Sequence, residues 1–247
     1  MTQHIRNVIL LSCILSVSFI PFVSADSELL AGEAVLEKGI GTVEILKSGT
    51  DSWVASYDNM ILQEGDRIRT IGEESAASIR FQDNTVVQVT GEADLSIPEI
   101  RSQEEGPGKK TVLDLKKGAL RAVFTKLKPG EESHFEVKTP TSVCGVLGTT
   151  IYIDSSTGSV YVAEGTLTVR NNATGEEYTV EAGEIISIAP DGSTGGAQGA
   201  TEEQVQHMLN NFAGLDINIL GYSLTGDPDE DEFIIFTPGL EEAATRT

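Results

Sequence analysis

The chain has 247 residues, of which 17 are basic and 38 acidic, so its formal net charge is −21. This excess of negative charge argues against nucleic acid and anionic lipid as partners, because both carry charge of the same sign. Hydrophobic residues make up 39% of the chain, and a chain of this length can bury a core without disulfides or metals.

The first 25 residues are typical of a secretory signal peptide. Arg6 lies in a polar start, an apolar run occupies residues 8–23, and the segment ends in Val-Ser-Ala. We therefore predict cleavage after Ala25 and an exported chain that begins at Asp26 and is periplasmic or secreted. Cleavage would remove one basic residue and no acidic one, so the mature chain would carry a formal charge of −22.

The two cysteines bear on lipid attachment and on disulfides. Lipidation at Cys13 is an alternative to ordinary cleavage, but only a short apolar stretch, residues 8–11, precedes this cysteine. Without Cys13 the exported chain contains Cys144 alone, so it has no internal disulfide available. No other segment approaches the roughly 20 apolar residues of a membrane-spanning helix, so we expect no membrane insertion after cleavage.

Residues 26–40 are interpreted as a lead-in, and residues 41–190 as one all-β domain. Within the domain, short runs rich in Val, Ile and Thr alternate between apolar and polar residues. Turn signals such as Asp83-Asn84 and Asn171-Asn172 separate them. Clear examples are the runs at 41–46, 77–81, 85–89, 133–138, 159–163 and 184–188.

Glycine begins several of these runs. Gly41-Thr-Val, Gly118-Ala-Leu and Gly165-Thr-Leu form a loose internal repeat at unequal spacings. Because glycine allows the backbone to turn with positive φ, this repeat favours an antiparallel or rolled domain, either a jelly roll or a β-solenoid-like stack. The unequal spacings argue against a strict solenoid. The alternative is that these glycines are ordinary turn residues.

The stretch 139–154 has the composition of a strand that is interrupted. Thr139-Pro140 closes one strand, because proline cannot continue a central ladder. We predict that residues 143–147 cross between layers, with Cys144 as a small buried hydrophobe. Gly148 would then permit a close backbone approach before pairing resumes. A reactive or intermolecular Cys144 is the alternative, since a lone exported thiol is unusual.

The composition changes after residue 190. Residues 191–200 are rich in glycine and are interpreted as a flexible linker. Residues 201–247 form an acidic C-terminal region with one short helix, for which Thr201 is the predicted N-cap. The acidic run at 227–232 is either a solvated segment or a weak calcium site. The apolar residues of the helix have helical spacing: Val205, Met208, Leu209 and Phe212.

Residues suited to catalysis or to metal binding are scarce. After cleavage, the histidines are His134 and His207. His134 follows Ser133, but neighbouring residues of a strand point to opposite faces, which argues against a nucleophile and its base. One cysteine and two distant histidines lack the spacing of a zinc site. We therefore expect no enzymatic activity, no metal and no cofactor.

Basic residues gather between residues 109 and 128, where Asp114 is the one acidic residue. In so acidic a chain, this segment is a candidate binding patch. The alternative is a solvated edge strand that lysines protect against further pairing. A further hypothesis is that the acidic region 201–247 covers these strands, against the alternative of a free tail. The patch consists of Lys109, Lys110, Lys116, Lys117, Arg121, Lys126 and Lys128.

Six stretches between about residues 41 and 188 resemble the FecR domain family, in the family's order. They are Glu64-Gly-Asp-Arg-Ile-Arg-Thr70, the run at 75–85, Phe135-Glu-Val-Lys-Thr-Pro-Thr141, Leu147-Gly-Thr-Thr-Ile-Tyr-Ile153, Val160-Tyr-Val-Ala-Glu-Gly165 and Glu181-Ala-Gly-Glu184. The resemblance implies an all-β domain that senses or scaffolds. It assigns structural roles to Gly65, Asp66, Thr139, Pro140, Gly148, Thr149, Gly165 and Gly183.

The best-known members of this family carry the domain on the periplasmic side of an anti-sigma regulator. This sequence shows no cytoplasmic domain and no membrane-spanning helix of that kind, so it is similar to stand-alone exported members. The resemblance implies a non-enzymatic binding, sensing or scaffold module of the bacterial envelope, whose partner is an envelope protein or an anionic glycan. The alternatives are an envelope polysaccharide hydrolase with paired carboxylates, and a surface or matrix protein that self-associates through residues 233–236.

Overall fold

The structure is a computed structural model, and it describes residues 29–30, 32–101, 109–124, 133–146, 148–210, 212, 218–219 and 222–223. The predicted signal peptide, Lys126, Lys128 and the segments 227–232 and 233–236 lie outside the described residues. In the described part the regular structure is β apart from one short helix near the C-terminus, which confirms the predicted all-β class. No helix of that part is long and apolar enough to span a membrane.

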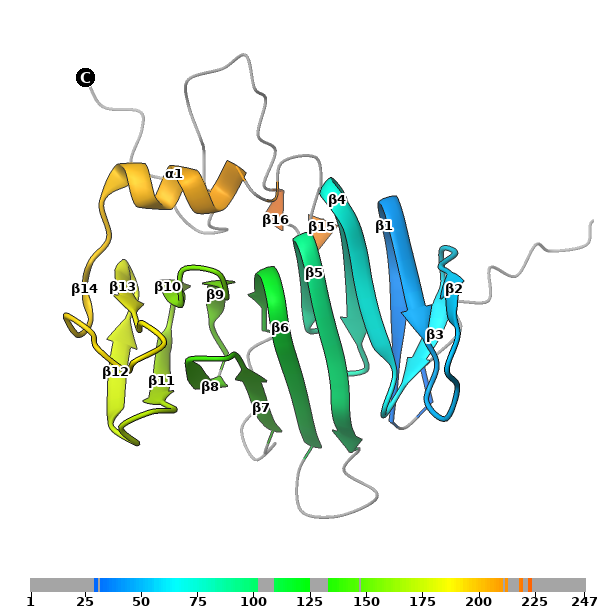
Figure 1. Ribbon diagram of the computed structural model, residues 1–247, viewed down its shortest axis with the longest axis horizontal. Coiled ribbons are helices and arrows are strands. Elements are labelled where there is room, and N and C mark those ends of the chain that lie inside the picture. The colour runs from blue at the N-terminus through cyan, green and yellow to red at the C-terminus, as the bar shows by residue number, and fades with distance from the viewer. Residues whose placement is uncertain are drawn as a thin grey trace, which may run out of the picture.

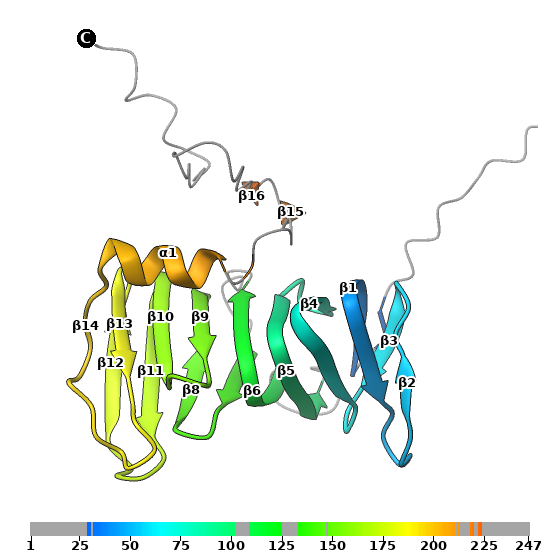
Figure 2. The same cartoon turned by 45° about the horizontal axis from the view of Figure 1, so that its top comes forward.

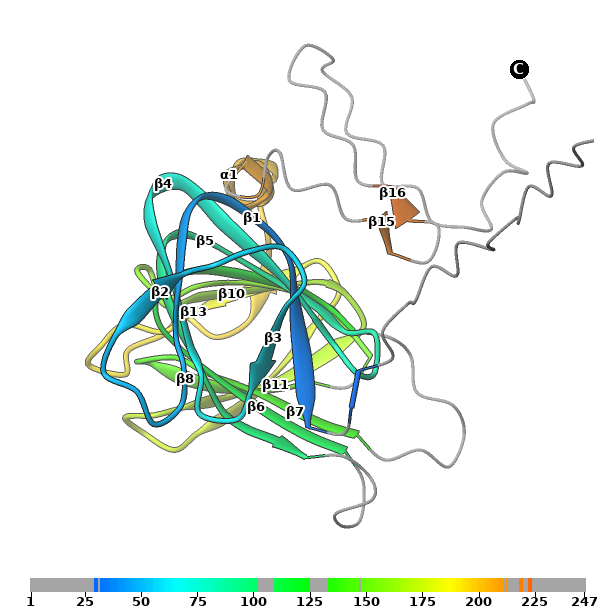
Figure 3. The same cartoon turned by 90° about the vertical axis from the view of Figure 1, so that its right-hand side faces the viewer.

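Four long strands form the centre of the fold: β1 (Glu33–Leu46), β4 (Arg67–Phe81), β5 (Val86–Arg101) and β6 (Lys109–Val123). Each bends and contributes one half to each of two facing layers (Figure 1). In β1, for example, residues 42–46 pair with residues 67–71 of β4, while residues 34–40 pair with residues 76–81. Figure 3 looks along the resulting roll.

Shorter strands extend each layer beyond the four long ones. The first layer adds β2 (Trp53–Ala55), β7 (Ser133–Lys138), β8 (Ser142–Val146), β11 (Thr166–Asn171) and β12 (Glu177–Glu181). The second layer adds β3 (Met60–Gln63), β9 (Thr150–Asp154), β10 (Ser159–Glu164), β13 (Glu184–Ser187) and β14 (Gln198–Gly199). The β6–β7 pair is parallel, and the other described pairs are antiparallel. Outside both layers, β15 (Asn218–Ile219) pairs with β16 (Tyr222–Ser223).

The roll has two ends and one glycine-rich side. β2 and β3 form one end, and β12 and β14 form the other (Figure 2). Wherever the chain passes between layers on the glycine-rich side, a glycine with positive φ lies at the bend, as the glycine repeat predicted. A Cβ at Gly118 would lie 2.6 Å from the Cα of Ala93, so this bend requires glycine. The glycines with positive φ at the bends between layers are Gly41, Gly72, Gly91, Gly118, Gly148, Gly165 and Gly183.

Inward side chains of both layers form one core. Leu95 and Leu113 of the first layer and Ile79 and Leu120 of the second are fully buried, as strand alternation requires. Cys144 belongs to the same core and is fully buried, which confirms its prediction as a small hydrophobe. Complete burial of one large aliphatic side chain stabilises the fold by about 1.5–3 kcal/mol.

The helix α1 (Glu202–Asn210) lies on the outside of the second layer (Figure 2). Thr201 is its N-cap, because the Thr201 hydroxyl accepts a hydrogen bond from the Gln204 amide at 3.3 Å. The Gln204 side chain in turn accepts one from the Thr201 amide at 2.9 Å, which completes a capping box. Met208 and Phe212 are buried against the layer, so the helical spacing predicted its contact face.

The structure places strands in two segments that the sequence predicts as a lead-in and a linker. Residues 33–40, within the predicted lead-in, are the first half of β1. Residues 191–200, the predicted flexible linker, contain β14, and the Gly192 carbonyl accepts a hydrogen bond from the Asn171 side chain at 2.8 Å. Glycine-rich composition suggested freedom, but hydrogen bonds from distant residues hold this segment against the domain.

Two further predictions are corrected by the strand order. Residues 143–146, which were expected to cross between layers, belong to β8 and pair with both β7 and β11. The crossing comes after β8, since β9 lies in the second layer. β6 is not an edge strand, because it pairs with β5 on one side and with β7 and β9 on the other.

Candidate functional site

The outer surface of the first layer carries a set of charged side chains that we call the charged face. Alternation along each strand directs the polar residues outward while their neighbours fill the core. Strand register places Arg67, Ser96, Asp114 and Lys138 in one row across β4, β5, β6 and β7. The charged face consists of Glu44, Arg67, Arg69, Asp94, Asp114, Lys116, Glu136 and Lys138.

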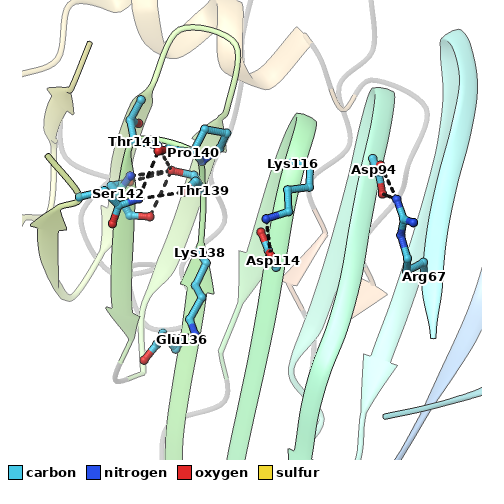
Figure 4. Close-up of polar contacts among 11 residues, drawn as sticks. Arg67, Asp94, Asp114, Lys116, Glu136, Lys138, Thr139, Pro140, Thr141 and Ser142 are labelled. Atoms are coloured by element: carbon cyan, nitrogen blue, oxygen red, sulfur yellow. Dashed lines mark hydrogen bonds and ion pairs between the residues drawn. The ribbon is translucent and has the colours of Figure 1, made fainter. Parts of the chain in front are cut away.

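Each cation of the charged face is paired with a carboxylate. Arg67 donates to both carboxylate oxygens of Asp94, at 3.0 and 2.8 Å (Figure 4). In the same view, the Lys116 Nζ lies 2.6 Å from Asp114, and the Lys138 Nζ lies 3.3 Å from Glu136. Exposed pairs of this kind contribute at most about 1 kcal/mol each to stability. Their effect is therefore to present balanced charges in fixed positions.

Trp53 borders the charged face at strand β2. The guanidinium carbon of Arg69 lies 4.2 Å from the centroid of the Trp53 ring, and that of Arg67 lies 5.5 Å away. The Arg69 Nε also donates to Glu44 at 2.7 Å. Stacking on the indole restricts both guanidinium groups, so the face is ordered up to its edge.

The predicted basic patch is divided between the two layers. β6 bends at Gly118, so the lysines at 109–117 belong to the first layer, and Arg121 belongs to the second. The Lys110 Nζ lies 2.7 Å from Glu99. The Lys117 Nζ lies 2.6 Å from Glu92 and lowers the pKa of that carboxyl by a hydrogen bond and by its charge. The described lysines therefore do not form a surface of one sign.

Arg121 is a buried residue beneath α1. Only 4% of it is exposed, and its guanidinium donates to the Gln88 side chain, with Nε at 2.9 Å. The guanidinium carbon lies 5.1 Å from the Phe212 ring and 6.0 Å from the Tyr152 ring. Burial lowers the pKa of Arg121 and raises the pKa of Tyr152. Arg121 therefore anchors the C-terminal helix.

The motif residues Gly65 and Asp66 hold two turns together. Asp66 is fully buried, and its carboxylate accepts hydrogen bonds from the Ser48 amide at 2.8 Å and the Gln63 amide at 2.9 Å. It also forms an ion pair with the Lys47 side chain. The Gly65 amide donates to the Ile97 carbonyl at 2.7 Å. Through these contacts the two residues join the β1–β2 turn to the β3–β4 turn.

Thr139 and Pro140 form the turn between β7 and β8. The Thr139 hydroxyl accepts from the Ser142 amide at 2.9 Å, and the Thr139 amide donates to the Ser142 carbonyl at 2.8 Å (Figure 4). The Asn172 side chain donates to the carbonyls of Thr139 and Pro140, at 3.0 and 3.2 Å. The turn is therefore joined to the β11–β12 turn, which the sequence did not indicate.

The remaining motif residues shape the glycine-rich side of the roll. Gly148, Gly165 and Gly183 have φ values of 61°, 87° and 84°. A Cβ at Gly165 would lie 2.6 Å from the Cγ2 of Thr149, so these two residues pack at van der Waals limits. Thr149 is buried, and its carbonyl accepts from the Phe124 amide at 3.0 Å.

The residues considered for chemistry do not come together. The His134 Nε2 lies 3.4 Å from Glu136 on an exposed surface, and the Ser133 side chain lies outside the described part. Burial raises the pKa of the Cys144 thiol to about 12, so it stays protonated at neutral pH. Within the described residues, no three His, Cys, Asp or Glu side chains are grouped as metal ligands would be.

Residues 66–168 match the family model described as FecR protein. Two crystal structures of a candidate anti-sigma factor from Parabacteroides distasonis, at 1.65 and 2.50 Å resolution, are similar to the chain at 16% identity, with TM-scores of 0.46 and 0.45. Each match covers 60% of this chain and 66% of that chain, just under two thirds of its length. None of the curated proteins matches. Residues 66–168 of this chain are a FecR domain.

Proposed function

We propose that this chain is a non-enzymatic binding, sensing or scaffold module of the bacterial envelope, exported and then periplasmic or secreted. The FecR domain at residues 66–168 supports a module of this class. The sequence of residues 1–25 supports export. The charged face is the surface through which the module binds its partner.

The observation that carries the proposal is the pairing of charges on the charged face. Arg67 with Asp94, and Lys116 with Asp114, hold both signs in fixed positions on a sheet with a packed core behind it. A partner with the complementary arrangement can exchange these pairs for intermolecular ones, which gives specificity and orientation. Because carboxylates lie beside every cation of the face, a protein with both signs fits it better than a polyanionic glycan.

The test uses the mature chain, immobilised and exposed to an envelope extract, with bound proteins identified by mass spectrometry. The test variant combines Arg69→Glu with Lys138→Glu, and a control combines Lys38→Glu with Lys117→Glu, which changes the net charge equally off the charged face. We expect the wild type and the control to retain the same envelope protein and the test variant to lose it. Equal retention by all three would contradict the proposal. Release of reducing ends from envelope polysaccharide by the purified chain would instead support a hydrolase.

A further inference from the structure

The two ends of the first layer differ in how their open edges are built. Among the described strands, β12 pairs only with β11, and β2 pairs only with β1. On β12, Glu177 and Glu181 are exposed carboxylates, and charged side chains at a sheet edge oppose the addition of another strand. β2 consists of Trp53, Val54 and Ala55 and carries no charge. The β2 edge therefore lacks the protection of the β12 edge.

The backbone of β2 is arranged to accept another strand. The Ser56 amide donates to the Val43 carbonyl at 2.9 Å, and register places Val54 opposite Ile45. In an antiparallel pair, hydrogen-bonded and non-hydrogen-bonded positions alternate along each strand. Ser56 is at a hydrogen-bonded position, so Val54, two residues before it, also directs its backbone N–H and C=O groups toward β1. Trp53 and Ala55 consequently direct their N–H and C=O groups away from β1, toward the open edge.

Apolar side chains gather at the same edge. Four large hydrophobic residues are strongly exposed in the described part of the chain, and two of them are Val54, at 45%, and Tyr57, at 65%. A recess of about 310 Å³ lies between β1 and the residues at the end of β2, and Val43, Ala55 and Asp58 contribute to its lining. An incoming strand would thus find two exposed apolar side chains, Val54 and Tyr57, beside the free backbone groups.

The charges around β2 indicate which strand would fit. Asp51 and Asp58 flank β2 and are exposed. The neighbouring cations already have partners, since Lys47 pairs with Asp66 and Arg69 pairs with Glu44. A basic segment complements such an edge, and a second copy of this chain, with a net charge of −21, does not.

We propose that β2 is the docking edge for an extended, basic segment of the partner protein, which adds to the first layer as a further strand. This deepens, and rests on, the proposed binding function. Alternate apolar residues of the segment contact Val54 and Tyr57, while lysine or arginine residues at its ends face Asp51 and Asp58. Backbone hydrogen bonds to Trp53 and Ala55 supply affinity, and the side chains supply specificity.

The probe is an acetylated and amidated heptapeptide that alternates lysine and valine, titrated into the mature chain. We expect saturable binding and slower hydrogen exchange of the Trp53 and Ala55 amides. A peptide that alternates glutamate and valine should bind at least roughly ten-fold more weakly, because it meets carboxylates of the same sign. N-methylation of alternate peptide nitrogens along one edge should abolish binding, since it removes the donors needed for strand pairing.

The matched protein variants are Val54→Lys at the β2 edge and Thr179→Lys at the β12 edge. We expect Val54→Lys to lower the affinity for the lysine–valine peptide at least about ten-fold. Thr179→Lys should leave this affinity unchanged. Because the N-methylated peptide tests strand pairing on the unaltered chain, a folding defect of either variant would not obscure the result. Binding that survives N-methylation, or no binding at all, would overturn the proposal. If the wild type self-associates and Val54→Lys does not, the β2 edge binds a second copy of this chain. That result would also overturn the proposal.

The envelope capture experiment separates this inference from the function on which it rests. If Val54→Lys retains the captured protein and the Arg69→Glu, Lys138→Glu variant loses it, the β2 edge is not the docking site and the binding function stands. If every variant retains the captured protein as the wild type does, neither the charged face nor the β2 edge is the docking surface. If the wild type captures no envelope protein, the binding function itself fails. Loss of capture in Val54→Lys, with retention in Thr179→Lys, supports both.

Discussion

The guanidinium carbon of Arg121 lies 5.1 Å from the centroid of the Phe212 ring, so a residue of β6 and a residue just beyond α1 form one buried contact. Tyr152 completes it, with its ring centroid 5.8 Å from that of Phe212. Phe212 and Met208 are buried on the second layer, and Leu209 packs against the same cluster. The contact therefore helps to hold α1 on the second layer.

We expect Phe212→Ala to release α1 and to lower the free energy of unfolding by roughly 2–4 kcal/mol, because it removes a buried aromatic ring. Urea denaturation measures the loss, and faster hydrogen exchange across residues 203–210 reports the release. His207→Ala, at an exposed position of α1, is the control and should change stability by less than about 0.5 kcal/mol. Unchanged exchange in Phe212→Ala would show that other contacts hold the helix.

Much of this architecture could be predicted from residue patterns, because alternation and turn residues act locally. The predicted runs at 77–81, 133–138 and 159–163 lie within β4, β7 and β10. The glycine repeat at Gly41, Gly118 and Gly165 predicted positive φ, and all three have it. The spacing of Met208 and Phe212 predicted the buried side of the C-terminal helix.

What could not be predicted depends on which strands become neighbours. Arg121 and Lys116 are five positions apart in one strand, yet the bend at Gly118 places them in different layers. Arg67 and Asp94 pair because β4 and β5 are adjacent, and no local pattern encodes that register. The segment 191–200 has linker composition, and the hydrogen bond that holds it comes from the distant Asn171.

The buried ion pair of Asp66 should matter far more for stability than the exposed pair of Asp94. Asp66→Asn leaves the Lys47 charge without its partner and replaces an acceptor of two backbone amides, so we expect a loss of roughly 2–3 kcal/mol. Asp94→Asn breaks a half-exposed pair and should cost less than about 1 kcal/mol. Urea midpoints of the two variants provide the comparison. Equal losses would argue that Asp66 has no special structural role.

The bend at Gly118 should be sensitive to the size of the residue as well as to its φ. Gly118 and Gly175 have φ values of 91° and 76°, but a Cβ would lie 2.6 Å from Ala93 at the first position and has no neighbour within 4 Å at the second. Gly175→Ala should therefore cost only the strain of positive φ, about 1–2 kcal/mol. Gly118→Ala should cost roughly 2–5 kcal/mol, because the clash adds to the strain. Similar unfolding free energies for the two would show that the bend yields without cost.

Cys144 should make the fold lose more stability on going to alkaline pH than a variant without the thiol loses. Burial raises the pKa of Cys144 from 9.0 to about 12, so above pH 9.0 the unfolded chain loses a proton that the folded chain keeps. Fewer bound protons in the unfolded state mean that stability falls as pH rises, by up to about 1.4 kcal/mol per pH unit until the folded pKa is reached. Cys144→Ala lacks this effect, although it carries a constant cavity cost. Between about pH 8 and about pH 10.5, the wild type should therefore lose roughly 2 kcal/mol more than Cys144→Ala in urea unfolding at each pH. Parallel pH profiles for the two proteins would contradict burial of the thiol, as would alkylation of the native chain at the rate of a free cysteine.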